Sequence, residues 1–161
     1  MASPVQQRQE PAPEVDAHPE LERLPEWPQD TIAVLVTVAP EPHAIPVSWP
    51  VRAGDRRILL SLKSDRGSLA RLRARPEVAL LILGAGNVAL CARGRAAVLA
   101  DPMPGTTDYA AVELAVDTID DHRQSAFAVA TGIGRNVLDE SELHYLERRV
   151  ATLREMASLD T

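Results

Sequence analysis

The sequence contains very little cysteine and few aromatic residues. Cys91 is the only cysteine among 161 residues, which excludes an intramolecular disulfide and a zinc site built from cysteines. Aromatic residues make up 3% of the chain, whereas hydrophobic residues as a whole make up 45%. The chain is therefore long enough for one domain with a buried core, and that core must be built from Ala, Val, Leu and Ile.

Long hydrophobic runs and familiar catalytic motifs are also missing. No run reaches the roughly 18 apolar residues of a membrane span, and the N-terminal sequence MASPVQQRQEPAPEV lacks the apolar segment of a secretory signal. We therefore expect a cytoplasmic protein that binds no membrane. The GxSxG, P-loop and GxGxxG patterns are absent, and the four histidines lack ligand spacing. The sequence thus indicates neither a metal site nor particular catalytic residues.

The net charge of −6 is unevenly distributed along the chain. Residues 31–100 hold ten basic and four acidic residues, whereas the segments before and after them are acidic. The overall acidity argues against binding to nucleic acid, which favours a basic domain. The basic middle segment has two interpretations: it binds an anionic ligand, or its charges pair with the acidic flanks.

Composition changes after a polar, acidic and proline-rich start, and we expect residues 1–20 to form a flexible tail. Apolar runs rich in β-branched residues then predict six strands, at residues 31–38, 43–51, 57–63, 77–83, 88–100 and 125–131. Helices are predicted at residues 68–75, at residues 108–116 and at the C-terminus. Pro46 and Pro50 place the second strand at a sheet edge, and Gly94 suggests a bulge in the fifth.

The C-terminal helix has the clearest helical signal. Asp139 and Glu142 have the spacing of a capping box. An apolar stripe follows, made of Leu143, Leu146, Val150, Leu153 and Met156. Short strands with tight loops indicate a mainly β protein with peripheral helices, an α+β barrel or sandwich. We expect residues 21–135 to form this domain and residues 136–161 to form an amphipathic helix packed on the barrel or on a partner.

One segment, with the sequence SLKSDRGS, is the strongest candidate for a binding site. It joins a predicted strand to the start of a predicted helix, where free backbone N–H groups attract anions. Its cationic and hydroxyl side chains are Ser61, Lys63, Ser64, Arg66 and Ser68. Such groups can hold a phosphate by charge-assisted hydrogen bonds. The alternative is an ordinary loop in which Ser68 only caps the helix.

The order of these elements resembles the pyridoxamine 5′-phosphate oxidase-like family of flavin- and deazaflavin-binding split β-barrels. The resemblance covers the chain from Trp27 to Asp101. It rests on an H-x-x-P-V-x-W strand, a strand ending in Ser, a Leu before Pro-x-Val and a Gly-Arg-Ala strand. The residues that carry it are His43, Pro46, Val47, Trp49, Ser61, Leu72, Pro76, Val78, Gly94, Arg95 and Ala96. The fold that the resemblance implies is a six-stranded antiparallel split β-barrel of the FMN-binding type.

The resemblance also implies a homodimer with cofactors at its interface. It implies that the flavin ring is flanked by Pro46, Val47, Ser48 and Trp49. It implies that the phosphate is held by Ser61, Lys63, Ser64, Arg66 and Ser68. FMN is the first cofactor expected, an 8-hydroxy-5-deazaflavin coenzyme is the second, and haem is a third.

Two departures from the family pattern narrow the function. Many members have Lys where this chain has Ser68, so either Arg66 supplies that charge or the phosphate is bound less tightly. The chain also lacks the C-terminal Trp and the Arg-x-His motif of true pyridoxamine 5′-phosphate oxidases, so we do not expect it to be that oxidase. Three hypotheses follow: a flavin- or deazaflavin-dependent oxidoreductase acting on an unknown small organic substrate, a non-enzymatic flavin or haem binder or sensor on the same barrel, and a structural dimer without cofactor.

Overall fold

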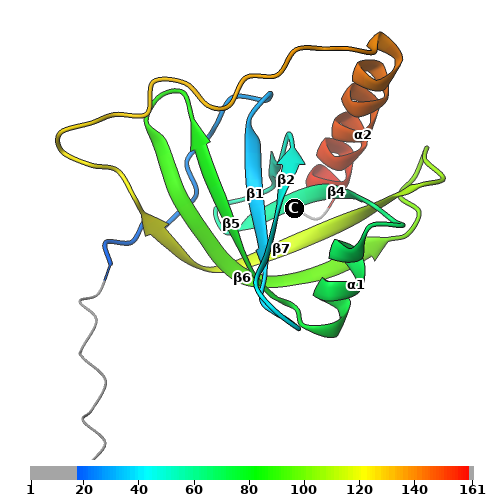
Figure 1. The fold of residues 1–161 in the computed structure, drawn as a ribbon, viewed down its shortest axis with the longest axis horizontal. Coiled ribbons are helices and arrows are strands. Elements are labelled where there is room, and N and C mark those ends of the chain that lie inside the picture. Colours follow the sequence, from blue (N-terminus) through cyan, green and yellow to red (C-terminus); the bar gives the residue numbers. More distant parts are fainter. Residues whose placement is uncertain (1–17, 160–161) are drawn as a thin grey trace, which may run out of the picture.

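In the computed structural model, which describes residues 18–159, seven antiparallel strands form one sheet that curls on itself (Figure 1). The strands are β1 (Ile32–Thr37), β2 (His43–Ser48), β3 (Val51–Arg52), β4 (Arg57–Lys63), β5 (Glu77–Gly84), β6 (Val88–Ala100) and β7 (Tyr109–Asp121). The helices are α1 (Gly67–Ala74) and α2 (Glu140–Leu159). The strand order is β2-β1-β5-β6-β7-β4-β3, so β2 and β3 are the two edges.

The predicted count of six strands is wrong, and two segments differ in kind from the prediction. The predicted helix at residues 108–116 is instead the start of β7, whose residues pair with both β4 and β6. The predicted strand at residues 125–131 belongs to no strand. Its Val129 exchanges hydrogen bonds only with Asn87, in the turn between β5 and β6. This segment therefore passes the turn between β5 and β6 without joining the sheet.

The predicted strand at residues 43–51 is divided between the two edges of the sheet. Its first part, β2, pairs with β1, whereas its last part, β3, pairs with β4. Between them Trp49 has a φ of 52°, in the left-handed region that a bulky side chain rarely adopts. Trp27 donates a hydrogen bond from Nε1 to the carbonyl oxygen of Pro50, at 2.8 Å. The chain thus passes from one edge to the other in two residues.

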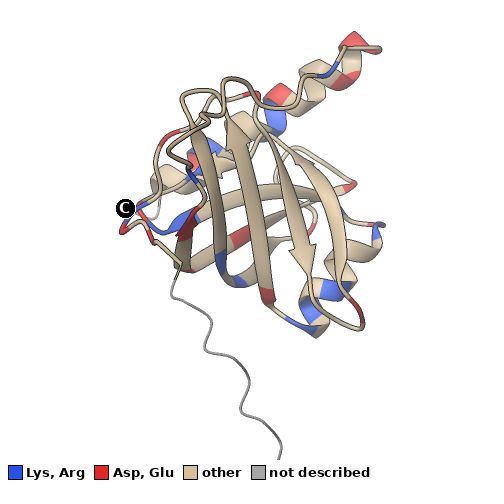
Figure 2. Cartoon of the chain, turned by 60° about the vertical axis from the view of Figure 1, so that its left-hand side comes forward, with Lys and Arg blue, Asp and Glu red and all other residues tan. Residues whose placement is uncertain are grey.

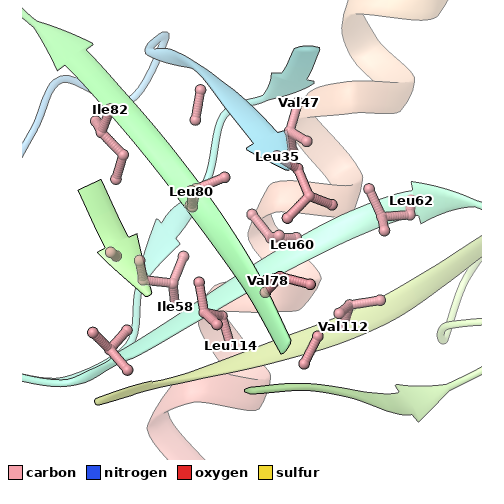
Figure 3. Packing of buried hydrophobic residues seen from close by; sticks show 14 of the residues in the cluster. Leu35, Val47, Ile58, Leu60, Leu62, Val78, Leu80, Ile82, Val112 and Leu114 are labelled. Atoms are coloured by element: carbon pink, nitrogen blue, oxygen red, sulfur yellow. The ribbon is translucent and has the colours of Figure 1, made fainter. Parts of the chain in front are cut away.

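The interior of the curled sheet is aliphatic, as the composition predicted. Figure 3 shows side chains from several strands pointing toward one another inside the curl, among them Leu35, Val47, Ile58, Leu60, Leu80 and Leu114. Leu24, from the segment before β1, is 1% exposed and joins this core. Burial of such side chains contributes about 1.5–3 kcal/mol each. The core therefore ties the N-terminal segment and the edge strand β2 to the other strands of the sheet.

Helix α2 covers the outer face of β4 through a second apolar cluster. Leu146, Val150 and Leu153 are buried there against Leu59 of β4. Asp139 accepts hydrogen bonds at Oδ1 from the backbone N–H of Ser141, at 2.9 Å, and from its hydroxyl, at 2.6 Å. Asp139 therefore caps this helix as predicted, and the predicted stripe is buried at Leu146, Val150 and Leu153 and partly exposed at Leu143 and Met156.

Charges are sparse on the strands and gather on α1 and at the ends of the elements (Figure 2). Helix α1 carries Arg71 and Arg73 in its last turn and no acidic residue in its first. No helix within residues 18–159 is long and apolar enough to cross a membrane. Most of the predicted tail, residues 1–17, lies outside the described residues.

Candidate functional site

A cavity of about 350 Å³ lies where β2 at one edge of the sheet faces β4 near the other edge. We call it the seam cavity. It exists because β3 pairs only with Ile58 and Leu59, which leaves the second half of β4 without a strand partner on that side. The residues that line it are Ile45, Pro46, Val47, Ser48, Ser61, Leu62, Lys63, Arg66, Ser68, Tyr109 and Arg149.

The charged residues around the seam cavity are all cationic. They are Lys63 from β4, Arg66 from the loop before α1, and Arg149 from α2. Among residues 18–159, no carboxylate lines this cavity. Three cations around one small cavity produce a positive potential, which concentrates anionic ligands.

The N-terminus of α1 opens beside these cations without a side-chain cap. Arg66 occupies the N-cap position, and its side chain makes no capping hydrogen bond. Ser68 lies inside the first turn and is buried, so the alternative in which Ser68 only caps the helix does not hold. Uncapped N–H groups and the helix dipole both favour an anion at this position.

The structure brings seven of the nine predicted site residues together in the seam cavity. These are Pro46, Val47, Ser48, Ser61, Lys63, Arg66 and Ser68. Trp49 lines a neighbouring cavity instead. The Ser64 hydroxyl donates to Oδ1 of Asp101 at 2.8 Å, and Ser64 does not line the seam cavity. The segment therefore places Lys63 and Arg66 at the seam cavity, whereas Ser64 forms a hydrogen bond with Asp101 within the fold.

Arg149 is the site residue that the sequence analysis missed. It is 7% exposed, and its guanidinium carbon lies 3.7 Å from the ring centre of Tyr109 and 4.7 Å from that of Tyr145. Its Nε donates to the Ser61 hydroxyl at 3.4 Å, whereas its buried Nη1 has no hydrogen-bond partner among the described residues. Burial lowers the pKa of Arg149 below its ordinary value.

The environment of Arg149 is unusual for a buried cation. Buried charges are normally paired with an opposite charge, yet Arg149 has no ion-pair partner within residues 18–159. Asp108 accepts a 2.6 Å hydrogen bond from the Tyr145 hydroxyl, which together with burial raises the pKa of Tyr145. The two rings and Ser61 therefore hold the guanidinium in place and leave part of its donor capacity free.

A second, larger cavity of about 610 Å³ adjoins the first. We call it the linker cavity, because residues 133–139 of the connection between β7 and α2 form one wall. Ser48, Tyr109 and Arg149 line both cavities. Trp49, whose backbone is strained, also lines the linker cavity. Such strain is often retained where it positions a functional group.

Comparisons with known proteins support the fold that the resemblance implied. No family model and no curated protein matches the sequence significantly. An F420 reductase superposes with a TM-score of 0.50 at 17% identity, covering 58% of this chain and 92% of that one. HupZ of Group A Streptococcus superposes with a TM-score of 0.50 at 12% identity, covering 65% and 90%.

A third similar structure is a protein of the pyridoxinephosphate oxidase family from Clostridium acetobutylicum, related to general stress protein 26. It has a TM-score of 0.46 and 14% identity, covering 58% of this chain and 81% of that one. At these identities the likeness concerns the fold. The chain therefore shares its fold with the F420 reductase and HupZ: a curled antiparallel sheet of seven strands with two helices, consistent with a split β-barrel.

Proposed function

We propose that this chain binds a phosphate-bearing flavin or deazaflavin in the seam cavity and acts as an oxidoreductase on a small organic molecule. The observation that carries the proposal is the set of three cations, with no carboxylate from residues 18–159, around a cavity at an uncapped helix N-terminus. Among the similar folds, one protein is an F420 reductase. FMN is the first candidate, and the 8-hydroxy-5-deazaflavin coenzyme is the second.

The phosphate fits the end of the seam cavity at α1. Lys63 and Arg66 supply positive charge there, and Ser61 and Ser68 supply hydroxyl groups. Arg66 is exposed and has no ion pair within the described part of the chain, so it is free to turn toward a ligand. Arg66 thereby compensates for the lysine that this chain replaces with Ser68.

The ring fits the other side of the cavity, along β2. As an edge strand, β2 leaves backbone groups on its outer side without a strand partner. Pro46 and Val47 offer apolar contact there, and Ser48 adds a hydroxyl group. Haem is less suited to this cavity, because no histidine, cysteine or methionine of residues 18–159 lines it, and these are common ligands of haem iron.

Such a cofactor supplies the hydride transfer when bound, so few protein acids or bases are required. The chain's own residues hold and orient the cofactor. We further propose that the protein is a homodimer, in which the partner covers the open side of the seam cavity. Sedimentation at micromolar concentration, with and without FMN, tests this; a monomer under both conditions contradicts it.

The cofactor site is tested by titrating purified protein with FMN and with riboflavin, which lacks the phosphate. Arg66→Ala should weaken FMN binding roughly ten- to a hundredfold, because a charge-assisted hydrogen bond contributes about 1.5–3 kcal/mol. Riboflavin should bind the variant and the wild type alike. Arg75→Ala is the matched control, since Arg75 lies at the other end of α1 and outside the cavity. Equal FMN affinity in all three proteins excludes the phosphate role of Arg66.

A further inference from the structure

The linker cavity has a single buried charge, the guanidinium of Arg149, at its border with the seam cavity. The other charged side chains that line it are exposed: Asp30, Arg135, Asp139 and Glu142. Glu142 and Asp108 act on Arg149 electrostatically, but neither is within ion-pair distance in the described structure. The inner end of the cavity is therefore cationic, and its outer rim is mixed in charge with an excess of acids.

Between the inner end and the rim, the lining is largely apolar. Ile32 and Leu146 are buried there, and Trp49 and Leu143 are partly exposed. Val137 and Leu138 complete the wall from the linker and are 54% and 97% exposed. Large apolar side chains that remain exposed beside a cavity commonly mark a binding surface.

We propose that the linker cavity is the substrate site, and that it takes an apolar carboxylate whose negative charge pairs with Arg149. This rests on the proposed function, because Ser48, Tyr109 and Arg149 line both cavities, so a substrate in the linker cavity adjoins a cofactor in the seam cavity. The substrate's apolar part lies along Ile32, Trp49 and Leu143.

The charges of the cavity favour a carboxylate over a phosphate. One guanidinium matches one carboxylate in a two-point hydrogen-bonded pair. The buried Nη1 of Arg149 lacks a partner in the described structure, so it can donate to a carboxylate once the guanidinium turns toward the linker cavity. A dianionic phosphate would meet only this one buried cation, and the acids Asp30, Asp139 and Glu142 would repel its second charge. Phosphate is better served by Lys63 and Arg66 at the far end of the seam cavity.

The experiment compares two probes of the same shape and different charge, 4-phenylbutyrate and 4-phenylbutyramide. Each is titrated into full-length protein without flavin, and heat of binding is measured by calorimetry. The wild type should bind the acid at least tenfold more tightly than the amide. Arg149→Gln should remove that preference, whereas Arg149→Lys, which keeps the charge, should retain part of it.

Arg148→Gln is the matched control. It removes one positive charge from the adjacent position of α2, where the side chain is exposed and lines neither cavity. It should preserve the wild-type preference for the acid. Thermal melting of each variant shows whether it is folded before the titrations are compared.

The position of the probe is tested in two ways. Leu143→Trp fills the linker cavity alone and should weaken binding of the acid more than tenfold while leaving FMN affinity unchanged. Saturating FMN should not displace the acid from the wild type, because the two ligands occupy different cavities.

Three results overturn the inference: equal affinity of the wild type for acid and amide, an unchanged preference in Arg149→Gln, or displacement of the acid by FMN. A loss of FMN affinity in Arg149→Gln as large as that in Arg66→Ala, with acid binding intact, would make Arg149 a phosphate ligand instead. A wild type that binds the acid through Arg149 but does not bind flavin would refute the proposed function and leave the carboxylate site established.

Discussion

The guanidinium of Arg149 in α2 lies 3.7 Å from the ring centre of Tyr109 at the start of β7. The two residues belong to elements that are joined by a long connection past the β5–β6 turn, and they meet because α2 packs on the outer face of β4 beside β7 (Figure 1). A desolvated cation over an aromatic face recovers about 2 kcal/mol. The ring therefore offsets part of the cost of burying Arg149.

Replacing the aromatic ring of Tyr109 should reveal how much its contact with Arg149 contributes to stability. Tyr109→Leu should lower the free energy of unfolding by about 1–2 kcal/mol, because the cation loses the face on which it rests. Tyr109→Phe keeps the ring and should remain close to the wild type. Urea denaturation measures both. If Tyr109→Leu and Tyr109→Phe unfold at the same urea concentration, the stacking contributes nothing.

Arg149 itself should be dispensable for stability. Because a buried charge without an opposite partner is costly, replacing it with an apolar side chain of similar length should not destabilise the fold. Arg149→Met should therefore be at least as stable as the wild type in thermal and urea denaturation, while losing any preference for anionic ligands. A clear loss of stability would identify Arg149 as a structural residue.

Gly94 should not tolerate a side chain. A Cβ at this position would lie 1.9 Å from the carbonyl oxygen of Ala115, at the register shift between β6 and β7. Gly94→Ala should lower the free energy of unfolding by several kcal/mol, of the order of an overpacked core. Gly134→Ala is the control, because nothing lies within 4 Å of its added Cβ. A wild-type melting temperature for Gly94→Ala would show that the two strands can separate there at little cost.

Asp121 should make the stability depend on pH in the acid range. Hydrogen bonds from the Arg123 side chain lower the pKa of Asp121 from 3.8 to about 2, against the opposing effect of burial. Because the pKa of Asp121 is lower in the folded state than in the unfolded state, its ionised carboxylate stabilises the fold at pH values above the unfolded pKa. This stabilisation is lost as the pH falls from about 4 to about 2.

Stability measured across this range should fall less steeply in Arg123→Gln than in the wild type. Added salt should reduce the difference, because the Arg123 side chain is 52% exposed and the pair is screened. Parallel pH profiles for the two proteins at low salt would contradict the assignment.

The sequence was sufficient to predict five of the strands, both ends of the α1 region and the capped helix α2. In those segments, the spacing of hydrophobic residues and the helix-breaking residues such as Pro76 favour the same secondary structure as the tertiary packing does. The stretch from Tyr109 to Val116 was misassigned because its Ala, Glu and Leu residues favour a helix. Its place between β4 and β6 decides otherwise, since pairing on both sides satisfies its backbone.

The candidate site was predictable only where it is local in sequence. Lys63, Arg66 and Ser68 lie within one short segment, and its pattern indicated an anion site. Arg149 reaches the same cavity from the other end of the chain, so no local motif includes it. One signal was present: Arg149 falls between Leu146 and Val150 on the apolar stripe of α2, where a charge is out of place.

The short passage through Trp49 and Pro50 has a consequence for how ligands are admitted. It tethers Ser48 on one edge of the sheet to Val51 on the other, and three peptide steps reach at most about 11 Å. Because β3 remains paired with β4, β2 cannot swing away from β4 without breaking that pairing. The seam cavity therefore keeps its width at the Ser48 end while β3 stays paired, so a ligand must fit this width rather than be enclosed by a movement of β2.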